Sequence, residues 1–140
     1  MRSIGILLLV AAGCGKGEKA PAEPERVQVQ HILISFAGTR TKATRTKEEA
    51  EKLALEVLEK VKKGEDFDAL SQKHSDDRPP GVYSMVNHNA PQILQAEIPR
   101  ARMVKGFGDV SFKLAVGEIG MAAWEEKDSP FGWHIIRRLK

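Results

Sequence analysis

Two short runs of β-branched residues, one near each end of the chain, constrain the fold most, because each has a histidine within it. The runs are VQHILI at 29–34 and WHII at 133–136. Side chains alternate along an extended strand, so His31 and His134 each share a face with aliphatic residues two positions away. Both histidines are therefore expected to point inward, either as separate core residues or as parts of one shared polar site.

Between these runs, the segment from Thr46 to Gly64 has the pattern of a complete helix. Thr46 and Glu49 have the spacing of a capping box, in which the hydroxyl and the carboxylate bind free backbone amides at a helix start. Gly64, after two lysines, is a typical C-terminal stop. One apolar stripe at helical spacing lies between them: Ala50, Leu53, Ala54, Val57, Leu58 and Val61.

The remaining elements are shorter. A second helix is expected from Asp66 to about residue 77, a strand at 82–86, a loop with a turn of helix near 93–98, a helix at 107–114, and a hairpin of strands 121–124 and 133–139. This order predicts an α+β domain in which helices pack around a small antiparallel sheet.

Length and charge narrow the class of protein. A chain of 140 residues has room for one domain, and 29% charged residues are ordinary for a globular protein. The net charge of +3 does not indicate nucleic-acid binding, because lysines alternate with glutamates along the first helix instead of forming a basic stripe.

The N-terminus differs in composition from the rest of the chain. Residues 1–13 have a basic start, an apolar run too short to span a bilayer and a small-residue end, so they are predicted to be a secretory signal peptide. Small residues before Cys14 resemble a bacterial lipobox, which implies cleavage and lipidation at that residue. The alternative is an uncleaved apolar tail with an incidental cysteine. The Gly-, Pro- and Lys-rich remainder of 14–26 is predicted to be a flexible tether, followed by the domain at 27–140.

Cys14 is the only cysteine. Its lipidation leaves no thiol for a disulfide or for nucleophilic catalysis, so the domain depends on its core for stability. The predicted location is the bacterial cell envelope, where a lipid anchor holds the domain facing the periplasm or the exterior.

Seven motifs in order, taken together, resemble the parvulin (PpiC-type) family of peptidyl-prolyl cis-trans isomerases. They are HILI at 31–34, RTKEEA at 45–50, GEDF at 64–67, SDD at 75–77, FGDVSF at 107–112, VGEI at 116–119 and SPFGWHII at 129–136. The resemblance implies a parvulin-like (FKBP-like) fold, with a four-stranded antiparallel sheet surrounded by helices. It also implies rotation of X-Pro bonds in proline-containing polypeptides, including unfolded or exported proteins, and no cofactor or metal.

The resemblance assigns site residues by position. It places His31, Asp77 and His134 at the catalytic centre, and it assigns the substrate proline ring to Met103 and Phe107, with Phe131 in the loop before the last strand. The wall after Asp77 departs from the family pattern, so either Val82 or Tyr83 is expected to line the pocket. Residues 87–101 resemble an insertion.

Each assignment has a plainer structural alternative. Spacing alone fits core packing for Met103 and Phe107, and a local turn bond for Asp77. Arg40, Lys42 and Arg45 fit a solvated loop better than a phosphate site. His74 and His88 lack metal-ligand spacing.

The sequence therefore predicts a lipid-anchored prolyl isomerase that assists the folding of extracytoplasmic proteins. Its alternative is a peptide-binding chaperone or assembly module with weak or no isomerase activity, favoured by the altered pocket wall and the insertion. No nucleic-acid partner is expected.

Overall fold

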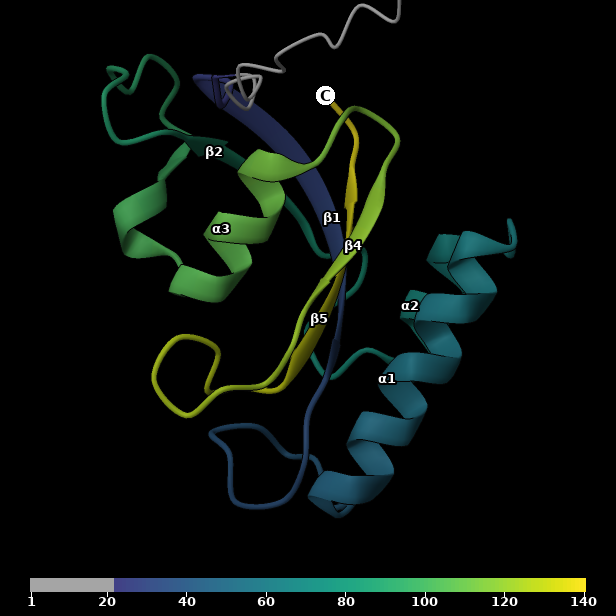
Figure 1. The fold of residues 1–140 in the computed structure, drawn as a ribbon. Coiled ribbons are helices and arrows are strands. Elements are labelled where there is room, and N and C mark those ends of the chain that lie inside the picture. The colour runs from purple at the N-terminus through teal and green to yellow at the C-terminus, as the bar shows by residue number, and fades with distance from the viewer. Residues whose placement is uncertain (1–21) are drawn as a thin grey trace, which may run out of the picture.

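The computed structural model describes residues 22–140, so the predicted signal peptide and Cys14 lie outside the described residues. Its centre is a five-stranded sheet in the order β3-β2-β1-β5-β4 (Figure 1). The strands are β1 (Arg26–Ile34), β2 (Val82–Val86), β3 (Ile98–Pro99), β4 (Ile119–Ala122) and β5 (Trp133–Arg138). The helices are α1 (Lys47–Lys62), α2 (Phe67–His74), α3 (Lys105–Lys113) and a 3-10 turn, η1 (Arg100–Arg102).

The α+β prediction is confirmed, with one addition to the sheet. Strands β2, β1, β5 and β4 pair antiparallel as expected, but β3 adds a fifth, two-residue strand parallel to β2. Strand β3 belongs to the stretch 87–101. The prediction of a turn of helix near 93–98 in this stretch is wrong. The buried Glu97 carboxylate accepts the backbone amides of Ile93 and Leu94, which closes a tight turn instead. Arg26 of β1 fastens this turn through a 2.8 Å ion pair with Glu97.

Helices cover both faces of the sheet (Figure 1): α1 and α2 lie on one face, and α3 lies on the other. Alternation along the strands supplies a separate apolar core to each side. The core under α1 and α2 takes Ile32, Ile34, Trp133 and Ile135 from the sheet. The core under α3 takes Val27, Val29, Met85 and Ile136.

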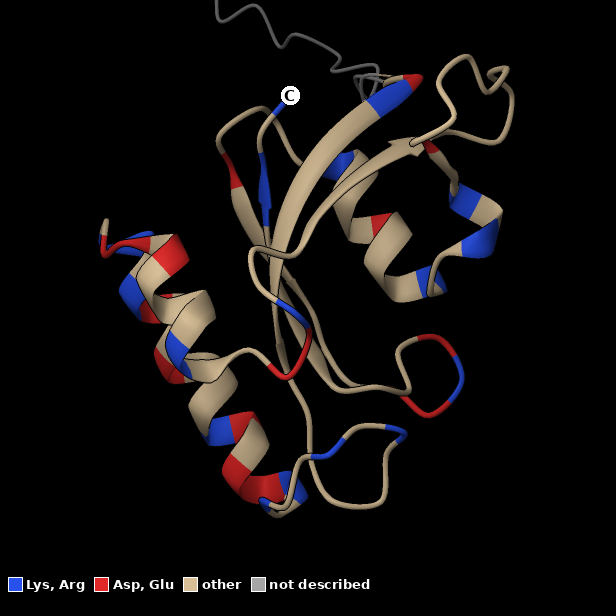
Figure 2. Cartoon of the chain, turned by 180° about the vertical axis from the view of Figure 1, so that it is seen from behind, with Lys and Arg blue, Asp and Glu red and all other residues tan. Residues whose placement is uncertain are grey.

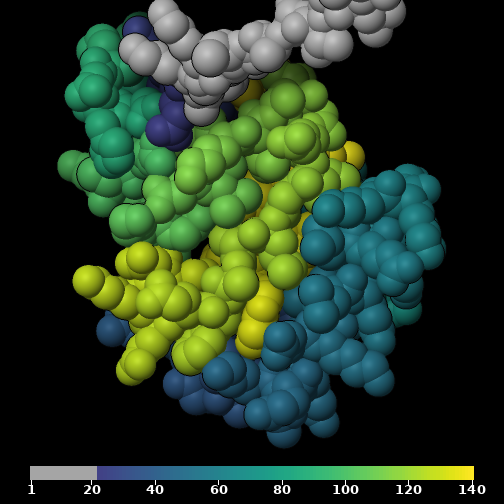
Figure 3. Space-filling model, viewed as in Figure 1, coloured from purple at the N-terminus to yellow at the C-terminus, as the bar shows by residue number. Residues whose placement is uncertain are grey.

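Helix α1 begins as predicted, because both halves of the capping box at Thr46 are formed. Its outer surface carries interspersed Lys and Glu, with no face of a single charge (Figure 2). Figure 3 shows β4 and the segment after it running across the front of the molecule between α3 and α1. None of the helices within 22–140 has the length and apolar character that crossing a membrane requires.

Gly132 fixes how closely the last hairpin approaches the central strand. Its φ is +144°, and a Cβ at this position would overlap the carbonyl oxygen of Ile34. Gly64 also has a positive φ, of +95°, but a Cβ there would meet nothing within 4 Å. Substitutions at these two glycines therefore distinguish the effect of backbone strain alone from that of strain combined with steric overlap.

We predict that Gly132→Ala destabilises the domain by more than about 4 kcal/mol or prevents folding, because strain and overlap act together. Gly64→Ala is the matched control and is expected to cost about 1–2 kcal/mol, from strain alone. Urea unfolding monitored by circular dichroism checks both, and equal losses would contradict the close approach of 132 to β1.

Candidate functional site

The pairing of β1 with β5 brings the two histidines together. Residue His31 lies opposite Ile136, and Leu33 lies opposite His134, so the histidines are diagonal neighbours on the same face of the sheet. Their Nδ1 atoms are 3.0 Å apart, and each residue is 4% exposed. Both therefore point inward as predicted, and they form one shared polar cluster.

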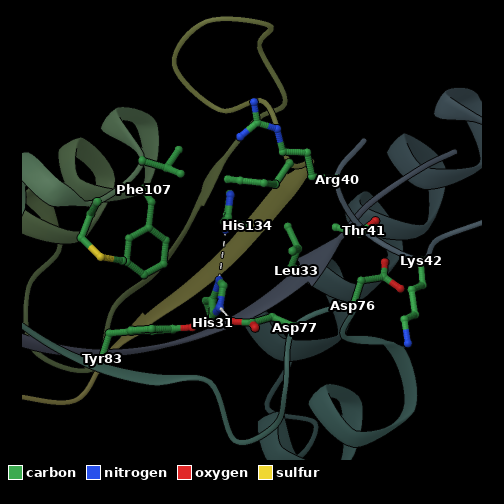
Figure 4. A pocket seen from close by; sticks show the side chains of 13 residues that line it. His31, Leu33, Arg40, Thr41, Lys42, Asp76, Asp77, Tyr83, Phe107 and His134 are labelled. Atoms are coloured by element: carbon green, nitrogen blue, oxygen red, sulfur yellow. Dashed lines mark hydrogen bonds and ion pairs between the residues drawn. The ribbon is translucent and has the colours of Figure 1, made fainter. Parts of the chain in front are cut away.

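Asp77 extends this cluster towards solvent (Figure 4). Its Oδ2 atom accepts hydrogen bonds from His31 Nε2 at 2.7 Å and from the Tyr83 hydroxyl at 2.6 Å. Its Oδ1 atom accepts the Arg78 amide at 2.8 Å. We call the residues Tyr83, Asp77, His31 and His134 the polar chain.

The polar chain has a defined distribution of charge. The hydrogen bond from His31 holds the pKa of Asp77 well below its usual range, and the bond from Tyr83 acts in the same direction, against the effect of burial. Burial, together with the Asp77 charge, raises the pKa of Tyr83. At neutral pH, therefore, Asp77 is an ionised acceptor and Tyr83 is a neutral donor.

The histidines complete this pattern. Burial lowers the pKa of His134 to about 3, and the neighbouring His31 ring acts in the same direction. Because ionised Asp77 only accepts, His31 Nε2 must carry a proton. The hydrogen bond between the two Nδ1 atoms then contains one proton, carried by either ring. His134 Nε2 is buried and has no protein partner among residues 22–140.

An open cleft of about 520 Å³ lies over the polar chain. Met103 from the segment before α3 and Phe107 from α3 line it, with Phe131 from the loop before β5 and Tyr83 from β2. Phe107 is 1% exposed and packs edge-on against both histidines, with ring centroids 5.1 and 5.4 Å apart, so it is the apolar floor of the cleft.

The structure separates the two candidates for the remaining wall. Tyr83 lines the cleft, but Val82 does not, and the expectation for Val82 is corrected. Alternation along β2 turns Tyr83 and Met85 towards the α3 side, whereas Val82 has the opposite orientation and is 41% exposed. The hydrogen bond from Tyr83 to Asp77 was not foreseen, and no spacing rule in the sequence indicates it.

The basic loop after β1 divides into two parts. Arg40 and Lys42 are exposed but line the cleft, so they are more than solvated loop residues. Arg45 instead turns inward and binds Asp76 at 2.5 Å and the Ser35 carbonyl oxygen at 2.9 Å. Adjacent aspartates thus differ in role, since Asp76 holds a loop while Asp77 faces the cleft.

Metal coordination finds no support in the donor arrangement. Within residues 22–140, no three His, Cys, Asp or Glu side chains gather in a group that could hold an ion. The Nδ1 atoms of His31 and His134 already share a hydrogen bond, and His31 Nε2 is hydrogen-bonded to Asp77.

Comparison with known proteins identifies the family. The family model described as the PPIC-type PPIASE domain matches residues 15–139. The chain belongs to this family. A PPIASE is a peptidyl-prolyl isomerase, so the family is the one that the seven motifs predict, and its fold agrees with the one described above.

Individual relatives agree with this assignment. Over 112 residues the chain is 34% identical to foldase protein PrsA 4 of Bacillus cereus, covering 80% of this chain and 31% of that protein. It is 32% identical over 115 residues to chaperone SurA of Pseudomonas aeruginosa, covering 82% of this chain and 24% of that protein. The chain thus spans about a third or less of the length of these relatives.

A solved structure shares the fold. Peptidyl-prolyl isomerase ESS1 from Candida albicans superposes with a TM-score of 0.62 at 21% identity, over 83% of this chain and 63% of that one. At this identity the likeness concerns the fold alone.

We predict that the free energy of unfolding falls as the pH drops from 6.5 towards 3, in part because of His134. Its folded pKa lies below the unfolded value, so in this interval the unfolded chain binds a proton that the folded chain does not. Its contribution is complete above pH 6.5 and is lost as the pH falls, with a slope of up to about 1.4 kcal/mol per pH unit.

Urea unfolding at a series of pH values measures this slope. His134→Asn, which keeps a nitrogen near the Nδ1 position, is expected to flatten it, whereas the exposed His88→Asn leaves it unchanged. An unaltered slope in His134→Asn would show that His134 titrates normally in the folded protein.

Proposed function

We propose that this chain is a peptidyl-prolyl cis-trans isomerase that acts on X-Pro bonds in exposed or unfolded polypeptide. One observation carries the proposal: an apolar cup formed by Met103 and Phe107 stands directly beside the polar chain, in a cleft open to solvent. Family membership supports the same activity.

The chemistry needs no bond to be broken. Rotation about X-Pro must overcome a barrier of about 18–20 kcal/mol that comes from amide resonance, so a catalyst only has to favour the twisted state. In the planar amide, resonance places negative charge on the carbonyl oxygen, and twisting withdraws it. A fixed carboxylate facing that oxygen disfavours the planar form, and we assign this role to Asp77.

The other residues of the site hold this arrangement in place. Met103 and Phe107 retain the proline ring, with Phe131 at the edge of the cup, while the rest of the peptide rotates. His31 and Tyr83 orient the Asp77 carboxylate through its Oδ2 atom, and His134 orients His31. Since no proton is transferred, the histidines act as positioning residues in this scheme.

A second candidate function is peptide binding as a chaperone or assembly module with little isomerase activity. Similarity to SurA of Pseudomonas aeruginosa, which is a chaperone, favours it. The same cleft serves both functions, so a measurement of turnover is needed to separate them.

We further propose that the domain is anchored to a bacterial membrane by a lipid on Cys14 and works in the cell envelope on exported polypeptides. The support is the pattern of residues 1–14 and the similarity of the chain to foldase protein PrsA 4 of Bacillus cereus. The segment from residue 14 to the start of β1 would then be the tether.

We predict that the full chain accelerates cis-trans exchange in X-Pro tetrapeptides, measured by exchange NMR. Asp77→Ala is expected to lower kcat/KM by about 10–100-fold, because it removes the carboxylate and unpairs His31. Met103→Ala should lower it by about tenfold by opening the cup, and Tyr83→Phe by less, since Asp77 keeps its bond from His31.

Leu55→Ala is the control, because Leu55 is 51% exposed on α1 and lies away from the cleft. If the unaltered chain accelerates no X-Pro peptide yet suppresses aggregation of an unfolded protein, the isomerase proposal fails and the chaperone proposal gains.

We predict that the protein isolated from a bacterial membrane begins at an acylated Cys14. Intact-mass spectrometry should give a mass lower by residues 1–13 and higher by the attached lipid. Cys14→Ser should abolish both changes and release the protein from the membrane fraction, whereas a free thiol on the uncleaved chain would refute the anchor.

A further inference from the structure

A second cavity of about 470 Å³ adjoins the cleft. It lies between the loop after β1 and the hairpin before β5, two segments that are neighbours in both Figure 1 and Figure 2. Its lining consists of Gly38, Thr39, Arg40, Glu126, Pro130 and Phe131. Arg40 and Phe131 line both cavities, so together they form the junction between them.

This junction is held from below by one buried hydroxyl. Ser35, the residue directly after β1, is fully buried, and its Oγ atom donates to the carbonyl oxygen of Phe131. The same Oγ lies 2.8 Å from Thr39 Oγ1 and 2.9 Å from Thr41 Oγ1, on either side of Arg40. Both loops that border the cavity are thus tied to the same point of the sheet.

The hairpin is fixed from its other side as well. Glu125 and Ser129 exchange two backbone hydrogen bonds across its tip, and the Gly106 amide of α3 donates to the Asp128 carbonyl oxygen at 2.7 Å. The wall that contains Pro130 and Phe131 is therefore joined to the helix that carries Phe107. The two cavities keep a fixed relation to each other.

The linings of the cavities differ in chemistry. The first has the apolar floor and cup that suit a proline ring. The second combines the main chain at Gly38 with opposite charges on Arg40 and Glu126, while the hydroxyl of Thr39 is already engaged by Ser35 and Thr41. Peptide groups and polar side chains need hydrogen-bond partners when they leave water, and such a lining offers both donors and acceptors.

We propose that the second cavity is a subsite for the stretch of substrate polypeptide adjacent to the X-Pro dipeptide. The protein then recognises an extended, unfolded segment, whose proline lies over Phe107 and whose neighbouring residues pass between Arg40 and Phe131. This inference rests on the proposed isomerase function and specifies its substrate. Figure 4 shows Arg40 at the side of the pocket away from Tyr83, which sets the direction in which the polypeptide leaves the proline cup.

Peptide length provides the test. Exchange NMR on the full chain compares an X-Pro tetrapeptide with two octapeptides, one extended by four residues before the dipeptide and one extended after it. Binding of residues remote from the rotating bond can raise kcat/KM, and we expect a gain of about tenfold for extension on one side only.

Variants that fill the second cavity should remove this gain. Glu126→Trp and Pro130→Trp alter different parts of the lining. In both variants, kcat/KM for the longer peptide is expected to exceed that for the tetrapeptide by less than about twofold. Tetrapeptide turnover should stay at the unaltered level, because neither residue lines the first cavity. Glu56→Trp, at an exposed position on α1, is the matched control and should keep the full gain.

The outcomes separate this inference from the proposed function. If neither tetrapeptide nor octapeptide is isomerised, the isomerase proposal itself fails. If the tetrapeptide is turned over but length brings no gain, or the gain survives in both tryptophan variants, the subsite is refuted and the isomerase proposal stands. If both tryptophan variants lowered kcat/KM by a similar factor for the tetrapeptide and the octapeptide, a separate subsite would also be refuted.

Discussion

The antiparallel pairing of β1 with β5 is the contact on which the rest of the site depends. It joins the two ends of the domain at the centre of the sheet, and its register sets His31 diagonally across from His134. A shift of one residue in either strand would turn one histidine to the opposite face, under α1. Gly132 permits this pairing, because any side chain there would collide with β1 just before β5 begins.

A buried polar cluster beside an apolar cup is costly unless its charged members are satisfied, and in the polar chain the ionised Asp77 is satisfied although His134 Nε2 has no protein partner among residues 22–140. Asp77 keeps its charge because two donors meet at Oδ2 and a third reaches Oδ1. His134 gives up its charge because it is buried beside His31. The Asp77 carboxylate therefore presents a fixed negative charge at the open end of the cluster, which is what a site that acts by electrostatic preference requires.

The sequence predicts the parts of this structure whose cause is local. The capping box at Thr46 and the alternation around His31 and His134 act within a few residues, and both give the observed structure. The family resemblance also assigns Met103, Phe107 and Phe131 to the pocket, and all three line the cleft. The choice between Val82 and Tyr83 was not available, because it depends on which face of β2 meets α3. The turn at 93–97 was also missed, since Glu97 overrides the local pattern by binding two amides and the distant Arg26.

The separate walls of the cleft work together because each is fastened to β1. The Leu33 amide donates to Ser75 Oγ and the Asp76 amide donates to the Leu33 carbonyl oxygen, which fixes the segment that carries Asp77. Two residues further on, directly after β1, Ser35 donates its amide to Asp76 Oδ2 and its hydroxyl to the carbonyl oxygen of Phe131. The carboxylate, the basic loop and the aromatic junction thus share one rigid support.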